Sequence, residues 1–229
     1  MKRWVLAGFA LAGAVVVTAC GSNPTPVAAR TLLGDARQTV NQAPAVHFDL
    51  ASHDLPSTGT ILEGGQGDLS RPDQLQGTFL VALDGLPANV GLIEVGGRFY
   101  AKLPFARGYK LTNPATFGIG DPARLLDPGA GVSRLLTEAA DPKVLGERRL
   151  SGELVEQISA TVAGTDVADF LPDANQAAPV RLIFDIDPAS HQVRLVEATG
   201  PFASASQTST YAVTLTRYGE RVTIATPPT

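Results

Sequence analysis

Hydrophobic residues recur along this chain with two different periods. Over residues 28–42 they return every three or four positions, which predicts an amphipathic helix that ends before Pro44. After Pro44 apolar and polar residues alternate, and this period of two is typical of half-buried strands. The strands expected in the first half of the chain cover residues 46–50, 59–70, 74–84, 89–95 and 98–103.

Short helices are expected to interrupt the strands in the middle of the chain. Asp121-Pro122 and Asp127-Pro128 each place a capping acid before a proline suited to the first helical turn. Residues 131–140 carry an apolar stripe that must be buried against other apolar residues. The later elements expected are a short helix at 165–171, a turn at 187–190, and strands at 143–150, 153–162, 180–187, 191–198 and 209–226.

This order of elements predicts an α+β domain built on one antiparallel sheet, because strands do not alternate with helices as they do in parallel βαβ folds. A sheet of about ten strands tends to curl, and three helices are too few to cover both of its faces. A curled sheet lined with Phe, Leu and Val and closed on one side by helices can leave an apolar cavity. The sequence therefore predicts a bent sheet with helices on its concave side.

The N-terminal segment has the pattern of a secretory signal. Lys2 and Arg3 precede an uncharged apolar stretch over residues 4–17, which is shorter than the roughly 20 residues of a transmembrane helix. Cys20, the one cysteine of the chain, follows small residues at the position that a bacterial lipobox requires. We expect cleavage before Cys20 and acylation of its thiol, which would anchor the exported protein to the outer face of the plasma membrane. An ordinary signal peptide with an incidental cysteine is the alternative.

These boundaries predict a signal peptide over residues 1–19, the lipidated cysteine with a short tether over 20–27, and one domain over 28–229. The whole chain has 18 basic and 22 acidic residues, a net charge of −4. Removing residues 1–19 removes Lys2 and Arg3 and no acid, which leaves a net charge of −6. An acidic chain without a basic run argues against nucleic acid as a partner.

Two sequence patterns resemble ligand sites but are expected to be structural. Residues 118–123 match the dinucleotide spacing G-x-G-x-x-A, yet the parallel βαβ context is missing, so we expect a loop that leads into a helix cap. The three histidines are His47, His53 and His191, and they lack the spacing of metal ligands. His47 and His53 lie around one strand and are expected to face solvent. Neither a cofactor nor a metal site is predicted.

The sequence also gives no support for catalysis. Asp185 and Asp187 could form a carboxylate pair, but the pattern favours solvated acids, with Asp187 starting a turn. No G-x-S-x-G elbow occurs, and no other arrangement of nucleophile and base stands out. We therefore do not expect an enzyme.

Several segments, taken together, resemble the actinobacterial LppX/LprA/LprF/LprG lipoproteins. The resemblance rests on the order and spacing of Cys20, the first helix, and residues 46–50, 67–69, 76–78, 97–103, 121–128 and 211–228. It implies a strongly bent half-barrel sheet whose concave side and helices enclose a hydrophobic cavity. It also implies a carrier that moves multiply acylated lipids or glycolipids from the plasma membrane toward the outer envelope, with a major-facilitator exporter as a candidate partner.

A carrier needs a cavity lining, and inward-facing apolar residues are the candidates. The predicted lining is Phe79, Val81 and Leu83 from one strand, Ile93, Val95 and Tyr100 from the hairpin, Leu135 and Leu136 from the covering helix, and Leu182 and Phe184 opposite. A scaffold or partner-binding lipoprotein with a solidly packed core is the alternative. The two hypotheses differ in whether the apolar interior is larger than its side chains can fill.

Overall fold

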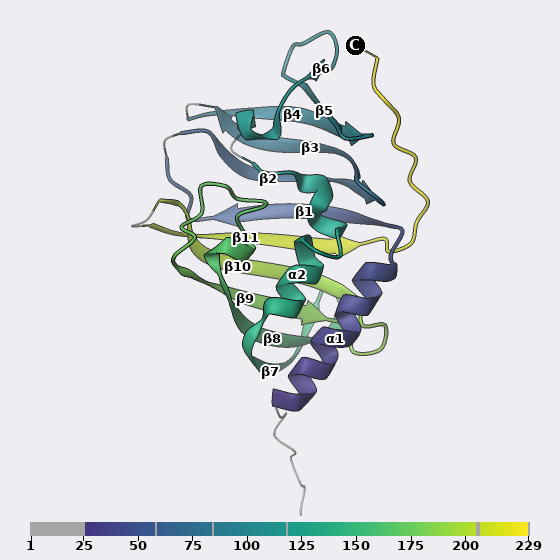
Figure 1. Ribbon diagram of the computed structural model, residues 1–229, viewed down its shortest axis with the longest axis vertical. Coiled ribbons are helices and arrows are strands. Elements are labelled where there is room, and N and C mark those ends of the chain that lie inside the picture. The colour runs from purple at the N-terminus through teal and green to yellow at the C-terminus, as the bar shows by residue number, and fades with distance from the viewer. Residues whose placement is uncertain (1–25, 58, 84, 118, 205–206, 229) are drawn as a thin grey trace, which may run out of the picture.

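The computed structural model describes residues 26–57, 59–83, 85–117, 119–204 and 207–228. Within these ranges eleven strands form one antiparallel sheet in the order β6-β5-β4-β3-β2-β1-β11-β10-β9-β8-β7 (Figure 1). The strands are β1 (Ala45–His53), β2 (Ile61–Ser70), β3 (Gln74–Leu83), β4 (Leu86–Val95), β5 (Arg98–Lys102), β6 (Lys110–Leu111), β7 (Ala140–Leu150), β8 (Glu153–Ala163), β9 (Pro179–Ile186), β10 (Val193–Ser204) and β11 (Gln207–Thr216). The predicted signal peptide and Cys20 lie outside the described residues.

Two meanders make up the sheet. Consecutive strands pair with each other from β1 to β6 and again from β7 to β11. The meanders join where β1 pairs with β11, with Phe48 opposite Leu215 and Leu50 opposite Val213. The first strand therefore lies in the middle of the sheet, beside the last.

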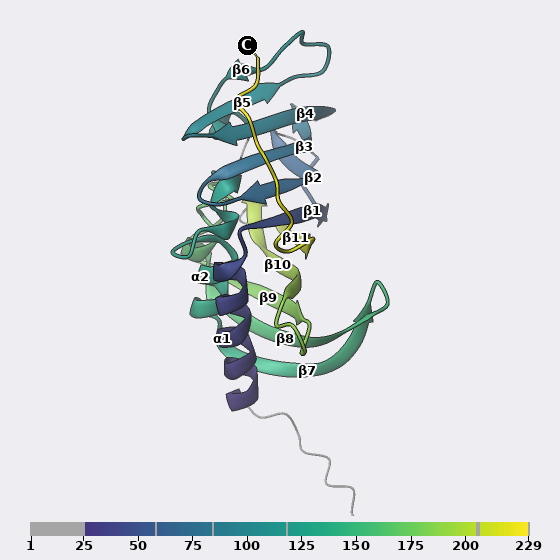
Figure 2. The same cartoon turned by 90° about the vertical axis from the view of Figure 1, so that its right-hand side faces the viewer.

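The helices lie on the concave side of this open, curved sheet, as Figure 2 shows. The two α-helices, α1 (Pro26–Gln42) and α2 (Gly131–Glu138), contact each other, and α1 also contacts β7. The other helices are three short 3₁₀ segments, η1 (Pro114–Phe117), η2 (Pro122–Leu126) and η3 (Gly164–Asp166). Inside the described ranges no helix has both the length and the apolar character needed to cross a bilayer.

The apolar stripes that predicted the helices are buried where they face the sheet. Leu33, Ala36 and Val40 of α1 and Val132 and Leu135 of α2 are all less than a tenth exposed and belong to one large core. Burial of these faces in a common core stabilises both helices, since α2 is too short to be stable by itself. The predicted α+β class and the bent sheet with helices on its concave side are confirmed.

The capping predictions are half right. Asp121 caps η2, because its carboxylate accepts a hydrogen bond of 3.0 Å from the Ala123 N–H. Asp127 ends η2 instead of starting the next helix: its carboxylate accepts from the Gly129 N–H at 2.7 Å. The helix expected at 165–171 is a single 3₁₀ turn followed by non-helical turns.

The C-terminal strand is shorter than predicted. The pattern suggested a strand over 209–226, but β11 ends at Thr216. The neighbouring strands offer no partner beyond this point, because Thr216 pairs with His47 near the start of β1 and β10 begins at Val193, close to the partner of Thr214. The remaining residues therefore leave the sheet. Residues 217–228, the C-terminal segment, run past the strand ends toward β6 and pack Val222 and Ile224 on β4 and β5 (Figure 1).

Two predictions of solvated polar residues are wrong. His47 is only 14% exposed at its side chain, and its Nδ1 lies 2.7 Å from Asp68 Oδ1 on the neighbouring strand. Asp185 is fully buried: Arg148 donates to both of its carboxylate oxygens, and Gln157 donates to Oδ1 at 3.1 Å. Alternation correctly put Asp185 opposite Phe184, but the sequence does not show that β7 and β8 supply partners that bury this outer face.

His53 is exposed, as expected. His191, for which no exposure was predicted, is half-buried in the turn before β10 and has a φ of 57°. Asp187 starts that turn as predicted, because its carboxylate accepts from the Ala189 N–H at 2.8 Å. Among the described residues no three histidine, cysteine or acidic side chains are grouped so that they could hold a metal ion.

Arg148→Ala should destabilise the fold by about 3 kcal/mol, because it leaves the buried Asp185 carboxylate without its ion-pair partner. Arg149→Ala is the matched control on the same strand, since Arg149 is exposed and donates only to the Gly152 carbonyl. We expect the control to change the free energy of unfolding by less than about 0.5 kcal/mol. Denaturant unfolding of both variants measures the difference, and equal effects would contradict the role given to Asp185.

Candidate apolar binding site

An apolar pocket lies between the concave face of the sheet and the helices that cover it. From the sheet it is lined by Phe48, Leu50, Leu62, Phe79, Val196, Ala198, Tyr211 and Val213. From the covering segments it is lined by Ile119, Gly120, Pro122, Leu125, Val132, Leu135, Val167, Phe170 and Leu171. Its free volume is about 110 Å³. The pocket spans the join between the two meanders, because β1 and β11 both contribute to it.

The floor of the pocket depends on a glycine. A Cβ at Gly65 of β2 would lie 2.6 Å from Phe79 Cδ1, so the missing side chain makes room for the Phe79 ring. That ring packs against Phe48 with centroids 5.6 Å apart. The missing side chain at Gly65 therefore leaves room for the Phe79 ring to lie beside the Phe48 ring.

The lining contains one polar side-chain atom, the Tyr211 hydroxyl. It donates to the Leu62 carbonyl at 3.0 Å. Burial raises the pKa of Tyr211 to about 12, so the hydroxyl stays neutral at physiological pH. Because its one donor is satisfied, the pocket offers apolar contact and no group suited to covalent chemistry.

Two segments form the cover of the pocket, residues 119–136 and residues 164–171. They approach so closely that a Cβ at Gly120 would lie 1.7 Å from the Asp169 carbonyl oxygen, and the Gly120 N–H donates to the Phe170 carbonyl at 2.9 Å. This contact explains why the second glycine of the G-x-G-x-x-A pattern, Gly120, has no side chain. As predicted, the pattern leads into a helix cap.

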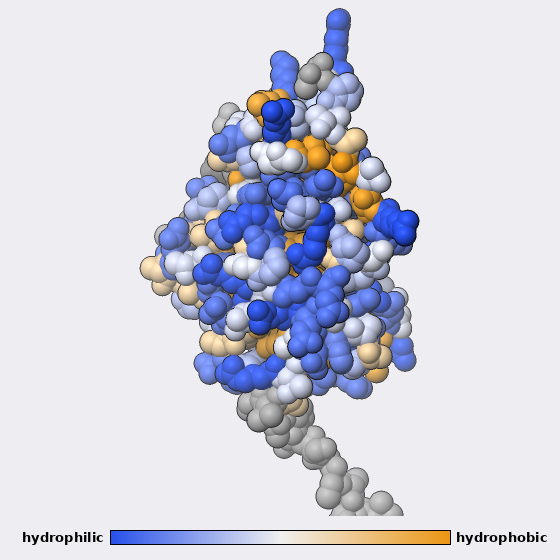
Figure 3. All heavy atoms as spheres, turned by 45° about the vertical axis from the view of Figure 1, so that its right-hand side comes forward, coloured by the Kyte–Doolittle hydropathy of each residue, from blue (hydrophilic) through white to orange (hydrophobic). Residues whose placement is uncertain are grey.

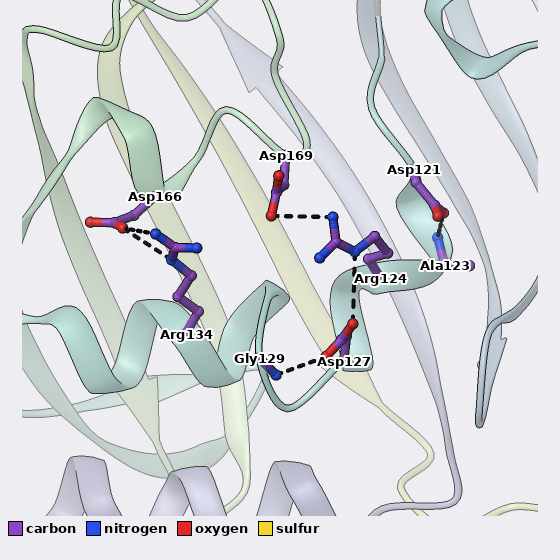
Figure 4. A network of polar contacts seen from close by, with 8 residues as sticks. All are labelled: Asp121, Ala123, Arg124, Asp127, Gly129, Arg134, Asp166 and Asp169. Carbon is purple, nitrogen blue, oxygen red and sulfur yellow. Dashed lines mark hydrogen bonds and ion pairs between the residues drawn. The ribbon is translucent and has the colours of Figure 1, made fainter.

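Ion pairs hold the two segments of the cover together, as Figure 4 shows. Arg134 of α2 donates to Asp166 Oδ1 at 2.7 and 3.0 Å, and Arg124 Nη1 lies 3.3 Å from Asp169 Oδ2. The Asp166 side chain is 10% exposed, whereas Arg124 and Asp169 are 41% and 37% exposed. The Arg134–Asp166 pair is therefore expected to contribute more to closure than the Arg124–Asp169 pair.

The size of the pocket limits what it can hold while the cover is closed. Sites for drug-sized ligands have volumes of about 300–1,000 Å³, and a cavity near 150 Å³ holds a molecule such as benzene. A free volume of about 110 Å³ is smaller than either. A long acyl chain can enter only if the cover moves away from the sheet.

The structure brings some of the predicted lining residues together. Phe79 and Leu135 line the pocket. The other core members of the predicted set pack in the same large core without lining the pocket; they are Val81, Leu83, Leu136, Leu182 and Phe184. Their contact with a ligand stays a prediction.

The hairpin residues are placed elsewhere, which corrects the sequence-based assignment. Ile93, Val95 and Tyr100 form a separate cluster with Val222 and Ile224 of the C-terminal segment, on the other face of the sheet. On β4 the inward residues are instead Val90 and Leu92, which belong to the large core. Both faces of β4 are covered, so apolar residues occur at odd and even positions and alternation alone does not fix which face points inward.

Glu94 is a buried acid that was not among the predicted site residues. Its side chain is 7% exposed and faces Asp121, the cap of η2. Desolvation, followed by the hydrogen bond with Asp121 and repulsion from Asp121 and Asp73, raises the pKa of Glu94 to about 8. Its burial could have been predicted from alternation along the strand, because Glu94 points to the same face as the inward residues Val90 and Leu92.

The architecture is a curved, open antiparallel sheet with an apolar pocket between its concave face and a helical cover. This chain belongs to the LppX_LprAFG lipoprotein family, whose model matches residues 28–224. The family resemblance seen in the sequence is thereby confirmed.

Relatives and solved structures support the same assignment. The lipoarabinomannan carrier protein LprG of Mycobacterium tuberculosis H37Rv is 28% identical over 232 residues, covering 98% of this chain and 94% of the relative. The LprG of Mycobacterium leprae is 25% identical over 204 residues, covering 85% and 83%.

Two crystal structures share the fold. LprF from Mycobacterium bovis aligns with a TM-score of 0.69 at 17% identity, covering 90% of this chain and 99% of that one. LppX from Mycobacterium tuberculosis aligns with a TM-score of 0.64 at 14% identity, covering 88% and 100%. The bent sheet with its helical layer is therefore an architecture that this family repeats.

Asp166→Ala should loosen the cover. It removes the partner of Arg134 and the acceptor of the Ala163 N–H, at a cost of about 1.5 kcal/mol. Amide hydrogen exchange in residues 131–138 and 164–171 should accelerate by about tenfold. Asp169→Ala, which breaks the more exposed pair, is the control and should change exchange little. Equal acceleration in both variants would contradict the greater weight given to Asp166.

Glu94→Gln should make the protein more stable in mildly alkaline solution. The pKa of Glu94 in the folded protein, about 8, lies above its ordinary value of 4.5, so the folded state keeps a proton that the unfolded chain releases. The contribution of Glu94 to stability is complete below about pH 4.5 and is lost as the pH rises to about 8. The stability difference between Glu94→Gln and the parent should therefore grow over this range in denaturant unfolding. Glu147→Gln, at an exposed position, should show no such trend.

Proposed function

We propose that this protein is an exported, membrane-anchored lipoprotein that binds multiply acylated lipids or glycolipids in its apolar pocket. It carries them from the plasma membrane toward the outer envelope. The observation that carries this proposal is the pocket itself: a lining of apolar side chains, with one satisfied hydroxyl, beneath a cover held by ion pairs. The relatives named as lipoarabinomannan carriers support an acylated glycolipid as the class of cargo.

The physical task of such a carrier is to keep methylene groups out of water. Each exposed CH₂ costs about 0.8 kcal/mol, so a lipid with tens of methylenes leaves a bilayer extremely slowly without an apolar receptor. In the proposed cycle the cover separates from the sheet, acyl chains enter between them, and the lining residues replace the lipid neighbours. Only binding and release are needed, and no bond is made or broken.

Anchoring is proposed through Cys20. A diacylglycerol on the thiol and a further acyl chain on the new N-terminus supply more than the single chain that gives only marginal membrane binding. This places the domain beside the outer face of the plasma membrane. A major-facilitator exporter in that membrane is the proposed source of cargo.

A scaffold lipoprotein with a solid core is the alternative function. It would share the signal, the anchor and the sheet, but it needs no free volume behind a cover. The apolar pocket of about 110 Å³ between the sheet and its cover favours the carrier.

The proposal is tested with the exported chain carrying Cys20→Ser, produced in an actinobacterial host and purified without detergent. Native mass spectrometry followed by lipid extraction should show a defined adduct with two or more acyl chains. A clean apo mass in several preparations, together with no uptake of added glycolipid, would favour the scaffold.

Phe79→Trp and Leu135→Trp should lower the loaded fraction by about tenfold, because each fills space in the pocket and overpacking costs roughly 1–3 kcal/mol. Leu154→Trp on β8 is the control, since Leu154 is 42% exposed and lies outside the pocket. The adduct peak in native spectra measures loading for all three. Unchanged loading in both pocket variants would count against this lining.

A further inference from the structure

The segment from β5 to η1 has a charge opposite to that of the protein as a whole. Between Glu94 and Asp121 the sequence contains Arg98, Lys102, Arg107 and Lys110 and no acidic residue. The whole chain, by contrast, carries a net charge of −4. All four basic side chains are exposed, and none forms an ion pair with another described residue.

The same segment exposes large hydrophobic side chains. In the β5–β6 loop, residues 103–109, the side chain of Phe105 is fully exposed, and Leu103 is 46% exposed. Leu111, just after the loop, is 65% exposed. Phe105 has a φ of 64°, so a conformation that non-glycine residues rarely adopt holds its ring away from the core. Several large exposed apolar side chains in one short segment, unlike single scattered ones, indicate an interaction site.

The loop lies at one end of the long axis of the molecule, and α1 begins at the other end (Figures 1 and 2). Figure 3 shows hydrophobic side chains gathered toward the upper end, next to strongly hydrophilic ones. Cys20 precedes Pro26 by six residues, which span at most about 21 Å. An anchor at Cys20 therefore holds the start of α1 near its membrane and leaves the loop free to face away from it.

We infer that the β5–β6 loop docks on an anionic lipid surface that faces the anchoring membrane, with Phe105 inserted at the interface and Lys102, Arg107 and Lys110 at the headgroups. The orientation relative to the anchor rests on the proposed function, while binding of the loop to lipid does not. The loop gives the carrier a contact site for the surface that receives its cargo.

The combination of charge and exposed apolar area identifies the lipid surface. Interfacial segments bind when apolar side chains enter the headgroup boundary and basic side chains attract anionic lipids. Each basic residue near such a surface strengthens binding roughly fivefold at low salt, and this gain falls as salt screens the charges. Leu145 on β7 is also exposed, but it does not lie in a purely basic segment. The acids Glu147 and Glu153 lie in the same hairpin as its basic residues.

A single tryptophan reports insertion directly. The one Trp of the chain is Trp4, which lies in the predicted signal peptide, so the exported chain carries none. Phe105→Trp in a Cys20→Ser chain produced without residues 1–19 therefore gives an indole only at the loop tip, where the exposed site tolerates it. Leu145→Trp, at a 54% exposed residue of β7, is the matched control.

The probe is a vesicle of phosphatidylcholine and phosphatidylglycerol in equal parts, compared with phosphatidylcholine alone. We expect a blue shift of the Phe105→Trp emission, and quenching by brominated acyl chains, with the anionic vesicles at low salt. Leu145→Trp should show neither. No shift for Phe105→Trp, or equal shifts with neutral and anionic vesicles, would overturn the inference.

Sedimentation with the same vesicles measures affinity. Phe105→Ser should weaken binding at least tenfold. Lys102→Gln with Lys110→Gln should weaken it roughly twenty-five-fold and flatten its salt dependence. Leu145→Ser should bind like the parent. Circular dichroism checks that each variant is folded, and a folded Phe105→Ser protein with full affinity would contradict the proposal.

A clustering assay tests the orientation. Lipidated protein in neutral vesicles should crosslink them to a second, anionic population, and Phe105→Ser should abolish this clustering. Binding without clustering would show that the loop touches the anchoring membrane instead. That result would overturn the inference that the loop docks on a second surface facing that membrane. Cargo loading is measured separately, so loss of the lipid adduct with intact vesicle binding would reject the carrier function and leave the docking surface standing.

Discussion

The pairing of β1 with β11 is the constraint on which the rest of this structure depends. It joins two meanders that are separated along the chain by η1, η2 and α2, and it places Phe48 opposite Leu215 and Leu50 opposite Val213. Side chains cross the same seam, because Tyr211 donates to Leu62 of β2. The pocket lies over this seam, so neither meander alone could form it.

The sequence predicts those parts of the fold in which one face is buried and the other is wet. Alternation correctly located most strands, and the inward face of β3 is the predicted one, with Phe79 in the pocket. The prediction fails where a second layer covers the outer face. On β4 that layer is the C-terminal segment. It buries Ile93 on the outer face of the sheet, opposite the face that carries the pocket. On β9 the outer face is covered by side chains from β7 and β8, and these bury Asp185.

The cover could be predicted only in part, because its contacts join residues far apart in the chain. The sequence shows a cap at Asp121 and an apolar stripe in α2, but not that Gly120 meets Asp169 or that Arg134 meets Asp166. These contacts are long-range, and no local pattern encodes them. Together these contacts close the cover over a pocket that is too small for a lipid. The pocket must therefore enlarge, by movement of the cover, before a lipid can bind.

The C-terminal segment leaves the sheet and ends beside the β5–β6 loop. The Pro228 carbonyl oxygen would lie 3.7 Å from a Cβ at Gly108, so the described C-terminal segment ends against the β5–β6 loop. An affinity tag at that terminus would add bulk and charge at the loop tip. The tight β7–β8 hairpin at Ser151-Gly152, at the opposite end of the sheet, offers a site for labels or immobilisation that leaves both the loop and the anchor accessible.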